Sequence, residues 1–382
     1  MSGRRVLLLC GGRSEEHDVS LASARSVLEA VDGSPLLEVV PLVIGRDGAA
    51  LGLEASARLL GAPVRPLPNG RAAHGPDAGE GQAATDGEVD RSALASADHG
   101  PDRPAAAPAE LARSLADAGG AFDVVFPLLH GPYGEDGSVQ GLLKLMGLPF
   151  VGSDVLGSAV SMDKLAMKAA FAAAGLPQVE HRAVTRHAFR SDPEAALAPA
   201  RELGLPVFVK PANLGSSIGV SRVDDPADLQ AAVAEALGFD RRAIVEAAAM
   251  GARELEVAVL GNDEPVASGV GEVRVRDGAG AFYDYQAKYT DGRADLFVPA
   301  DVPEEVARAA RAMALEAFAA VDAAGLARVD FFYLPDGRLL VNEINTIPGF
   351  TRHSMYPRLW QAAGLSYPEL IERLVELAVE RR

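Results

Sequence analysis

The feature that most constrains the fold of this chain is a predicted β-hairpin over residues 329–345. Both arms are apolar, and the Asp336-Gly337 dipeptide between them is a strong signal for a two-residue turn. A turn at this dipeptide sets Asp330 directly opposite Glu343, and cross-strand partners project from the same face of a sheet. We therefore expect a sheet near the C-terminus that carries two facing carboxylates.

A third side chain with an oxygen atom joins that face. Asn345 lies two residues beyond Glu343, so it returns to the face that Asp330 shares. Two carboxylates and one amide suit a hard cation such as Mg²⁺, which is often shared with nucleotide phosphates. The alternative is a polar strip that faces solvent. We favour the metal site because an otherwise apolar strand becomes polar only where the three ligands meet.

Length and composition restrict the class of protein. The 382 residues are enough for two or three domains, and the hydrophobic share of 48% excludes a disordered chain. No apolar run approaches the ~20 residues that a membrane span needs. The net charge of −17 argues against nucleic-acid binding, which requires a basic surface. The single cysteine, Cys10, permits no internal disulfide, so we expect a cytoplasmic protein with neither membrane nor nucleic-acid partners.

Predicted strands and helices alternate in the N-terminal part, which is typical of an α/β sheet. Residues 62–109 interrupt the alternation, because they are rich in Ala, Gly, Pro and Asp and contain few large apolar side chains. Such a segment cannot bury enough surface to order itself, so we expect a flexible insertion. The expected strands cover 6–10, 39–44 and 122–129, and the expected helices cover 21–30 and 138–146.

The rest of the chain mixes helical and strand patterns, so the expected fold class is α/β with mixed α+β domains around clefts. Residues 191–199 give a weak signal and are expected to form an ordinary connection. The predicted domains are 1–151, 152–246 and 247–382. Before the hairpin, the expected strands cover 206–210, 219–223 and 243–246, and the expected helices cover 163–173, 226–237 and 303–324.

A loop of small residues, 210–219, joins two predicted strands. Small residues let backbone N–H groups approach a phosphate closely, and Lys210 adds a positive charge at the strand end. The spacing is not that of a P-loop, and an ordinary hairpin loop has the same composition. Lys164 begins a predicted helix and could reach the same phosphates, although a solvated lysine is the commoner case.

Other segments offer weaker candidate ligands. Glu246 and Glu254 flank strands and can accept hydrogen bonds from an adenine or a ribose, although solvated carboxylates are commoner there. The loop 11–18 offers a carboxylate to a substrate ammonium group, and the loop 130–137 follows a strand end, where ligands of α/β sheets gather. Three tyrosines in the glycine-bordered loop 283–289 predict a lid, and a surface loop anchored by aromatic packing is the alternative.

Together and in this order, these segments resemble the D-alanine–D-alanine ligases of the ATP-grasp superfamily. The resemblance covers nearly the whole chain except the expected insertion. It implies a three-domain ATP-grasp architecture with a Rossmann-like N-terminal domain. It rests on residues 11–20 (GGRSEEHDVS), 130–137 (HGPYGEDG), 161–164 (SMDK), 210–219 (KPANLGSSIG), 283–289 (YDYQAKY) and 342–349 (NEINTIPG).

The resemblance implies a reaction in two steps for peptidoglycan precursor synthesis. The carboxylate of one D-alanine attacks the γ-phosphate of ATP and becomes an acyl phosphate, and the amine of a second D-alanine then displaces phosphate. Two Mg²⁺ or Mn²⁺ ions would be held by Asp330, Glu343 and Asn345. The family also suggests a homodimer formed largely through the N-terminal domains.

The resemblance assigns further residues to each part of the site. Arg328 and the Gly349 amide would stabilise the oxyanion, and Glu16 would bind the first ammonium group. The implied catalytic residues are Glu16, Ser216, Tyr289, Arg328, Gly349 and Ser354. The implied ATP-binding residues are Lys164, Lys210, Ser217, Glu246, Glu254 and Lys288. The implied substrate-binding residues are Glu16, His130, Tyr283, Lys288 and Ser354.

Two departures and two alternatives accompany the resemblance. Gln286 stands where the family's lid often carries Glu, and the alanines 247–249 replace a stretch that often contributes a lysine beside the adenine. A relative that joins D-alanine to D-lactate or to another second substrate ranks second, because Lys288-Tyr289 resembles the alanine-using form. An ATP-binding regulator without catalysis ranks lower, because the metal ligands, both phosphate lysines and Arg328 are present.

Overall fold

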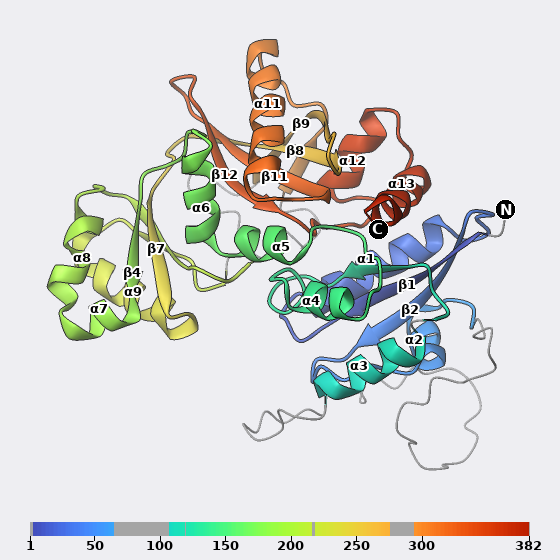
Figure 1. The fold of residues 1–382 in the computed structure, drawn as a ribbon. Helices are drawn as coiled ribbons and strands as arrows, with labels where there is room; N and C mark the ends of the chain where they lie inside the picture. The colour runs from blue at the N-terminus through green and yellow to red at the C-terminus, as the bar shows by residue number, and fades with distance from the viewer. Residues whose placement is uncertain (1–2, 65–106, 119, 216–217, 276–293, 382) are drawn as a thin grey trace.

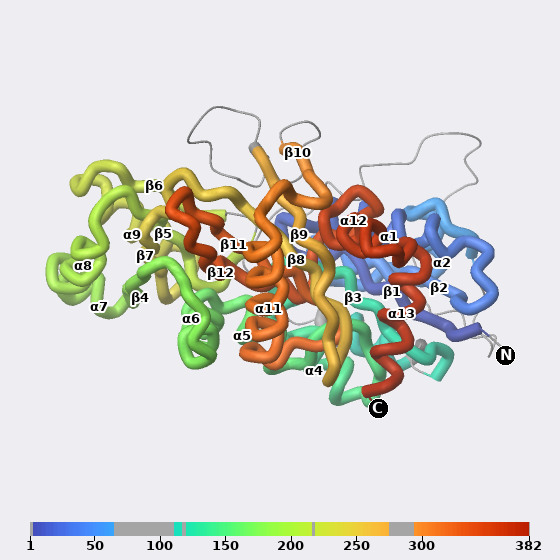
Figure 2. The backbone as a smooth tube through the Cα atoms, turned by 90° about the horizontal axis from the view of Figure 1, so that it is seen from above, coloured from blue at the N-terminus to red at the C-terminus, as the bar shows by residue number. Residues whose placement is uncertain are grey.

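Three sheets follow one another along the molecule, each with its own helices (Figures 1 and 2). The expected insertion at 62–109 falls for the most part outside the described residues, although its last residues begin helix α3. None of the described helices combines the length and the apolar character that crossing a bilayer requires. The computed structural model describes residues 3–64, 107–118, 120–215, 218–275 and 294–381.

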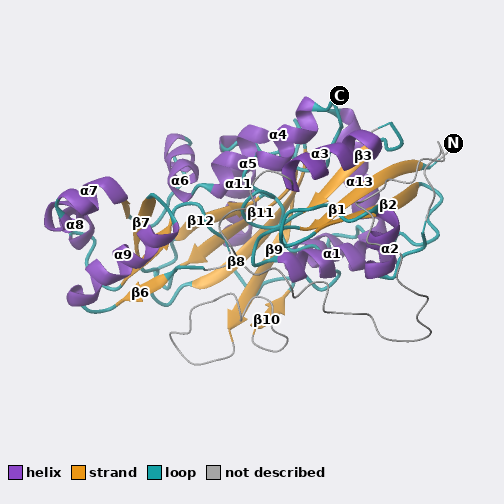
Figure 3. Ribbon diagram, turned by 90° about the horizontal axis from the view of Figure 1, so that it is seen from below, coloured by secondary structure: helices purple, strands orange, loops and turns teal. Residues whose placement is uncertain are grey.

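The N-terminal sheet is parallel, with the strand order β2-β1-β3, as the alternation of elements predicts. Helix α1 packs on one side of it, and α3 and α4 pack on the other (Figure 3). Because the strands are parallel, the loops after β1 and β3 leave the same edge. The elements are β1 (Arg4–Gly11), α1 (His17–Ala30), β2 (Leu37–Ile44), α2 (Leu53–Leu60), α3 (Ala107–Ala118), β3 (Val124–Leu128) and α4 (Ser138–Leu145).

The central sheet is antiparallel, with the order β4-β7-β5-β6, and α8 and α9 bury their apolar faces against it. Its members are β4 (His181–Thr185), α7 (Arg186–Ser191), α8 (Pro193–Arg201), β5 (Val207–Pro211), β6 (Ser221–Val223), a 3₁₀ turn (Pro226–Asp228), α9 (Leu229–Phe239) and β7 (Arg242–Ala247).

The expected connection at 191–199 is wrong, because α8 occupies most of this stretch and α7 ends at its first residue. Both helices are short and are defined by their caps. Thr185 Oγ1 accepts from Ala188 N at 3.1 Å, and Asp192 Oδ1 accepts from Ala195 N at 3.1 Å. Side-chain caps of this kind satisfy the first N–H groups of a helix that is too short for its periodicity to be recognised.

The C-terminal sheet is antiparallel, with the order β10-β9-β8-β11-β12. Helices α6 and α11 cover one of its faces, and α12 and α13 cover part of the other. Its strands are β8 (Arg253–Gly261), β9 (Val266–Val275), β10 (Ala294–Phe297), β11 (Gly325–Tyr333) and β12 (Leu339–Asn345). Its helices are α5 (Val155–Met162), α6 (Lys164–Ala173), α11 (Glu304–Ala320), α12 (Met355–Ala362) and α13 (Tyr367–Glu380).

A shared core joins the C-terminal helices to the N-terminal sheet. The ring of Phe350 lies 5.6 Å from that of Phe126 on β3, and the fully buried Tyr356 donates its hydroxyl proton to Val259 O at 3.0 Å. These contacts fix the N-terminal loops relative to the C-terminal sheet. Residues from both can therefore line one cavity.

The predicted two-residue turn of the hairpin is wrong by one residue. Leu334 N donates to Arg338 O at 2.9 Å, so residues 335–337 make the turn. Gly337 closes it with a φ of 89°, a conformation that glycine adopts without strain. A type I turn followed by a left-handed glycine is the common geometry of three-residue hairpin loops.

The predicted pairing of Asp330 with Glu343 is nevertheless confirmed. The register shifts between Asp330 and Phe331, which pairs with Val341, so Asn342 has no opposite residue. The three-residue turn shifts the pairing next to it by one residue, and the extra residue of the bulge in β12 shifts the pairing back. The two deviations offset each other, and the carboxylates meet as expected.

Candidate active site

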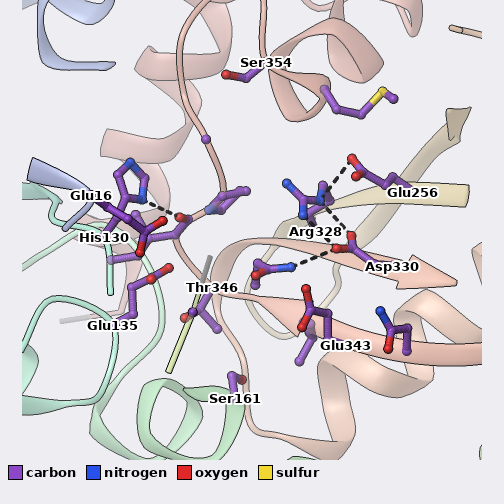
Figure 4. Close-up of a pocket in the computed structure, with 18 of the residues that line it drawn as sticks. Glu16, His130, Glu135, Ser161, Glu256, Arg328, Asp330, Glu343, Thr346 and Ser354 are labelled. Atoms are coloured by element: carbon purple, nitrogen blue, oxygen red, sulfur yellow. Dashed lines mark hydrogen bonds and ion pairs between the residues drawn. The ribbon is translucent and has the colours of Figure 1, made fainter. Parts of the chain in front are cut away.

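A cavity of about 800 Å³ lies where the three sheets approach one another, and its lining comes from all of them (Figure 4). The N-terminal loops contribute carboxylates and a histidine, α6 and the central sheet contribute lysines, and the C-terminal sheet contributes an arginine and more carboxylates. The predicted site residues that line it are Glu16, His130, Lys164, Lys210, Glu254, Arg328, Asp330, Glu343, Asn345, Gly349 and Ser354.

The polar wall of the cavity is built from the period-two alternation of two neighbouring strands. On β8, Glu254 and Glu256 share a face, while the residues between them enter the apolar core. On β11, Asp330 pairs with Glu256, and Arg328 lies on the same face. At one end of these strands, α12 and α13 cover this face of the C-terminal sheet. At the other end, the same face lines the cavity and carries charged side chains.

Arg328 joins the carboxylates of this wall. Its Nε and Nη2 lie 2.7 Å from the two oxygens of Asp330, and its Nε lies 3.1 Å from Glu256 Oε2. A guanidinium held at two points by a carboxylate is rigid and permanently charged. The resulting cation points into the cavity from a fixed position (Figure 4).

The three predicted metal ligands are brought together. Asp330 pairs with Glu343, and Asn345 Nδ2 donates to Asp330 Oδ2 at 3.1 Å. All three donors are oxygens on one face, as a hard cation requires. Among the described residues no group of three His, Cys, Asp or Glu side chains is placed to hold a metal, so the prediction depends on Asn345 as the third ligand.

The two predicted phosphate lysines both lie at the 210–219 loop. Lys210 is the last residue but one of β5, and its Nζ lies 2.6 Å from Glu246 Oε2. Burial alone would lower the pKa of Lys210, but Glu246, helped by Glu343 and Glu254, raises it above its usual value. Lys164 donates from its ammonium group to a carbonyl of the same loop. Lys210 is therefore charged at this wall of the cavity, and Lys164 lies beside the same loop.

A separate polar network fixes the loop to the rest of the central sheet. Asp240 Oδ2 accepts from Asn213 N at 2.9 Å and from Asn213 Nδ2 at 3.0 Å. Arg242 forms an ion pair with Asp163, which caps α6. The loop and the helix that carries Lys164 are thus tied to the same end of β7.

Glu246 is enclosed rather than open to the cavity. It is 3% exposed, and Lys168 Nζ lies 2.8 Å from its Oε1. Burial would raise the pKa of Glu246, but Lys210 and Lys168 together hold it far below its usual value. The predicted contact of Glu246 with the nucleotide stays a prediction.

The N-terminal loops form a pocket with two carboxylates and a histidine. Glu16 and His130 are both buried, and His130 Nδ1 lies 3.0 Å from Ile347 O. Glu135 accepts from Gly131 N at 2.6 Å. Burial lowers the pKa of His130, whereas burial and then the nearby Glu16 raise the pKa of Glu135 well above its usual value. A carboxylate in the cavity wall, such as Glu16, is the kind of group that binds a substrate ammonium group.

The segment after β12 contributes a hydroxyl and closely packed backbone. Ser354 precedes α12, and its Oγ accepts from Thr351 N at 3.2 Å. A methyl group added at Gly349 would lie 3.2 Å from that oxygen, so a larger residue would crowd Ser354. Ser354 and Gly349 both line the cavity, as the resemblance implies.

Several predicted residues fall outside the described part of the chain. The expected lid at 283–289 is among them, and so is the hydroxyl pair at the tip of the 210–219 loop. Glu16 Oε2 would lie 3.5 Å from a methyl group added at Gly215, so Glu16 does reach the described part of that loop. The predictions that remain open for this reason concern Ser216, Ser217, Tyr283, Gln286, Lys288 and Tyr289.

Three residues near the site had no predicted role. Glu256 has a simple signal, because it follows Glu254 by two residues in an apolar strand and therefore shares its face. Lys168 follows Lys164 by one helical turn, and a lysine among apolar residues of a helix indicates a buried partner. Glu135 gives no such signal, because turn formation alone accounts for the glycines and the proline around it.

Two antiparallel sheets contribute to the cavity, one with a lysine and the other with carboxylates, and an α/β domain closes it. This arrangement defines an ATP-grasp ligase. Family models described as the N-terminus and the C-terminus of D-ala D-ala ligase match residues 5–153 and 170–376. The chain belongs to the D-alanine–D-alanine ligase family.

Individual relatives agree along the whole chain. The D-alanine–D-alanine ligase of Deinococcus radiodurans is 49% identical over 381 residues, which cover 99% of both chains. The solved D-alanine–D-alanine ligase of Coxiella burnetii has a TM-score of 0.73 and 31% identity, with 100% of this chain and 95% of that chain covered. A D-Ala:D-Ser ligase from Enterococcus faecalis has a TM-score of 0.73 and 29% identity, with 99% and 100% covered.

Proposed function

We propose that this protein joins two molecules of D-alanine to D-alanyl-D-alanine, with conversion of ATP to ADP and phosphate, for peptidoglycan precursor synthesis. One observation carries the proposal: a single cavity is lined by Glu16 from the N-terminal loops, by Arg328 from the C-terminal sheet and by the lysines Lys164 and Lys210. A carboxylate for a substrate ammonium group, a guanidinium for an oxyanion and two lysines for phosphates are the groups that a carboxylate–amine ligation requires, and their presence in one cavity supports the proposal.

The residues divide the reaction between them. Glu16 holds the ammonium group of the first D-alanine, so that its carboxylate faces the γ-phosphate that Lys164 and Lys210 bind. A carboxylate oxygen attacks phosphorus, and ADP leaves. The amine of the second D-alanine then attacks the acyl carbon, and the oxyanion that forms is stabilised by Arg328 and the Gly349 amide. The attacking nitrogen loses a proton, and collapse of this intermediate expels phosphate and leaves the peptide bond.

We propose that Asp330, Glu343 and Asn345 hold two Mg²⁺ or Mn²⁺ ions. Their oxygen donors and their common face support this assignment. Such ions supply positive charge that lets an anionic carboxylate approach an anionic phosphate. The contacts of Ser217, Glu246, Glu254 and Lys288 with ATP, and of His130, Tyr283, Lys288 and Ser354 with substrate, belong to the same proposal.

The cellular setting and the assembly are also proposals. We propose a cytoplasmic homodimer, because the reaction consumes ATP and the family suggests a dimer through the N-terminal domains. We retain the domain boundaries after residues 151 and 246. Sedimentation of the purified protein tests the dimer, which a monomer at micromolar concentration would contradict.

The identity of the second substrate is tested by comparing acceptors. ADP release and product mass are measured with D-alanine alone, and with D-alanine plus D-lactate or D-serine. We expect D-alanyl-D-alanine to dominate, and no product with L-alanine. A dominant mixed product would instead favour a ligase of the D-Ala:D-Ser or D-alanine–D-lactate kind. ATP binding without ADP release would indicate a regulator.

A further inference from the structure

Helix α6 carries two lysines that face the central sheet. Lys164 and Lys168 are one turn apart, so they share a face of the helix. Met167 and Phe171 lie on another face and are buried in the core of the C-terminal sheet. The helix therefore lies between the two antiparallel sheets (Figure 1), and Lys168, which is 1% exposed, is buried beneath the wall to which Lys164 contributes.

Lys168 and Lys210 hold the same carboxylate from opposite sides. Lys168 Nζ lies 2.8 Å from Glu246 Oε1, and Lys210 Nζ lies 2.6 Å from Glu246 Oε2. Glu246 comes from β7 and Lys210 from the neighbouring strand β5. Of these three described side chains, Lys210 alone lines the cavity. One counter-ion of Glu246 is thus enclosed, and the other stands at the cavity surface.

This asymmetry matters when a phosphate enters the cavity. A buried carboxylate is costly without a cation. If Lys210 were the sole partner of Glu246, moving its ammonium group to a phosphate would leave that carboxylate unpaired. With Lys168 in place, Glu246 remains paired even when the Lys210 ammonium turns toward another anion. Three charged groups with a net charge of +1 therefore leave one positive charge available at the cavity.

We propose that Lys168 is a positioning residue for nucleotide binding, which keeps Glu246 paired so that Lys210 can leave that carboxylate for a phosphate. The proposal rests on the proposed function, because it takes the ligand of Lys210 to be ATP. Lys168 itself touches no substrate. Its effect is on the affinity for ATP and not on the chemical step.

The test is a Lys168→Met variant, which keeps the length of the side chain and removes its charge. ATP affinity is measured by calorimetry without D-alanine, and kinetics are measured with both substrates. We expect the Kd for ATP to rise about tenfold or more, as loss of one partner of a buried charge pair implies. The kcat at saturating ATP and the KM for D-alanine should change less than about threefold. Lys144→Met, which removes a lysine from an exposed pair with Asp154, is the control.

A double-mutant cycle separates positioning from a merely structural role. If Lys168 acts through Glu246, Lys168→Met should have little further effect on ATP affinity in a Glu246→Gln protein. An equal loss of affinity in both backgrounds would overturn the proposal, and so would a folded Lys168→Met protein with unchanged ATP affinity. If the single variant folds poorly, the Glu246→Gln protein and the double variant still test the proposal, because a further large loss of ATP affinity between these two would overturn it.

The two proposals fail in different ways. A wild-type protein that binds ATP but releases no ADP with D-alanine defeats the proposed function, while the ratio of ATP affinities still tests Lys168. A wild-type protein that does not bind ATP overturns both.

Discussion

Arg328 holds Asp330 at two points, with Nε 2.7 Å from Oδ1 and Nη2 2.7 Å from Oδ2. The resemblance assigns one residue to the oxyanion and the other to the metal, yet they form one electrostatic unit with Glu256. We expect a divalent cation at Asp330 to weaken this pair and to leave more of the guanidinium for a developing oxyanion. Metal binding and oxyanion stabilisation would then be coupled through these two side chains.

Arg328→Ala tests the oxyanion role. We expect kcat to fall about 10²–10³-fold, the usual cost of losing one such donor. Arg338→Ala removes an arginine from an exposed pair with Asp336 and should leave kcat unchanged. An Arg328→Ala protein that folds and retains the wild-type kcat would contradict the assignment.

Asp330→Ala and Glu343→Ala test the metal ligands. Each variant loses one of the two carboxylates, so we expect Mg²⁺-dependent turnover to be abolished. Asp336→Ala, an exposed acid in the hairpin turn, is the matched control. Turnover in either ligand variant at low Mg²⁺ would show that the cation is held elsewhere.

Asp240→Ala tests whether the network behind the 210–219 loop orders it for phosphate. The change removes the acceptor of two hydrogen bonds from Asn213. Hydrogen bonds to a charged group contribute about 1.5–3 kcal/mol, so the KM for ATP should rise about tenfold or more. Asp224→Ala, from an exposed pair with Arg222, provides the comparison. Equal KM values for ATP in the two variants would exclude this role.

Glu135→Gln tests the raised pKa of the buried carboxyl. Because burial and Glu16 raise the pKa of Glu135 in the folded state, the folded protein binds more protons than the unfolded chain above pH ~4.3. The stability that the protonated carboxyl contributes is therefore lost as pH rises toward the folded-state pKa. Glutamine mimics the neutral carboxyl, so the variant should lose less Tm than the wild type between pH 5 and pH 8. The exposed Glu305→Gln variant should follow the wild type, and parallel profiles for all three would refute the prediction.

Much of the fold could be predicted because its signals are local. Apolar runs marked β1, β2 and β3, and the spacing of Asp330, Glu343 and Asn345 set three donors on one face. The exact turn could not be predicted, because a longer loop and a bulge satisfy the same pairing. Helices α7 and α8 were missed because they are too short for a helical period to stand out, and side-chain caps mark where they begin.

The ion pairs around the cavity could not be predicted from the sequence for another reason. The partners of Glu246 come from α6 and β5, and those of Arg328 come from within β11 and from β8. Such pairings depend on how separate elements pack, and no spacing along the chain encodes that. The burial of Lys168 likewise follows from the position of α6 between two sheets.

The central claim is that the carboxylate of D-alanine is activated by phosphate from ATP, and transfer of an oxygen isotope tests it most directly. D-alanine labelled with oxygen-18 in its carboxylate is incubated with ATP, Mg²⁺ and the protein, and the released phosphate is analysed by mass. The account predicts one labelled oxygen in each phosphate released with a dipeptide, because the attacking oxygen leaves with phosphorus. Dipeptide formation accompanied by unlabelled phosphate would contradict it.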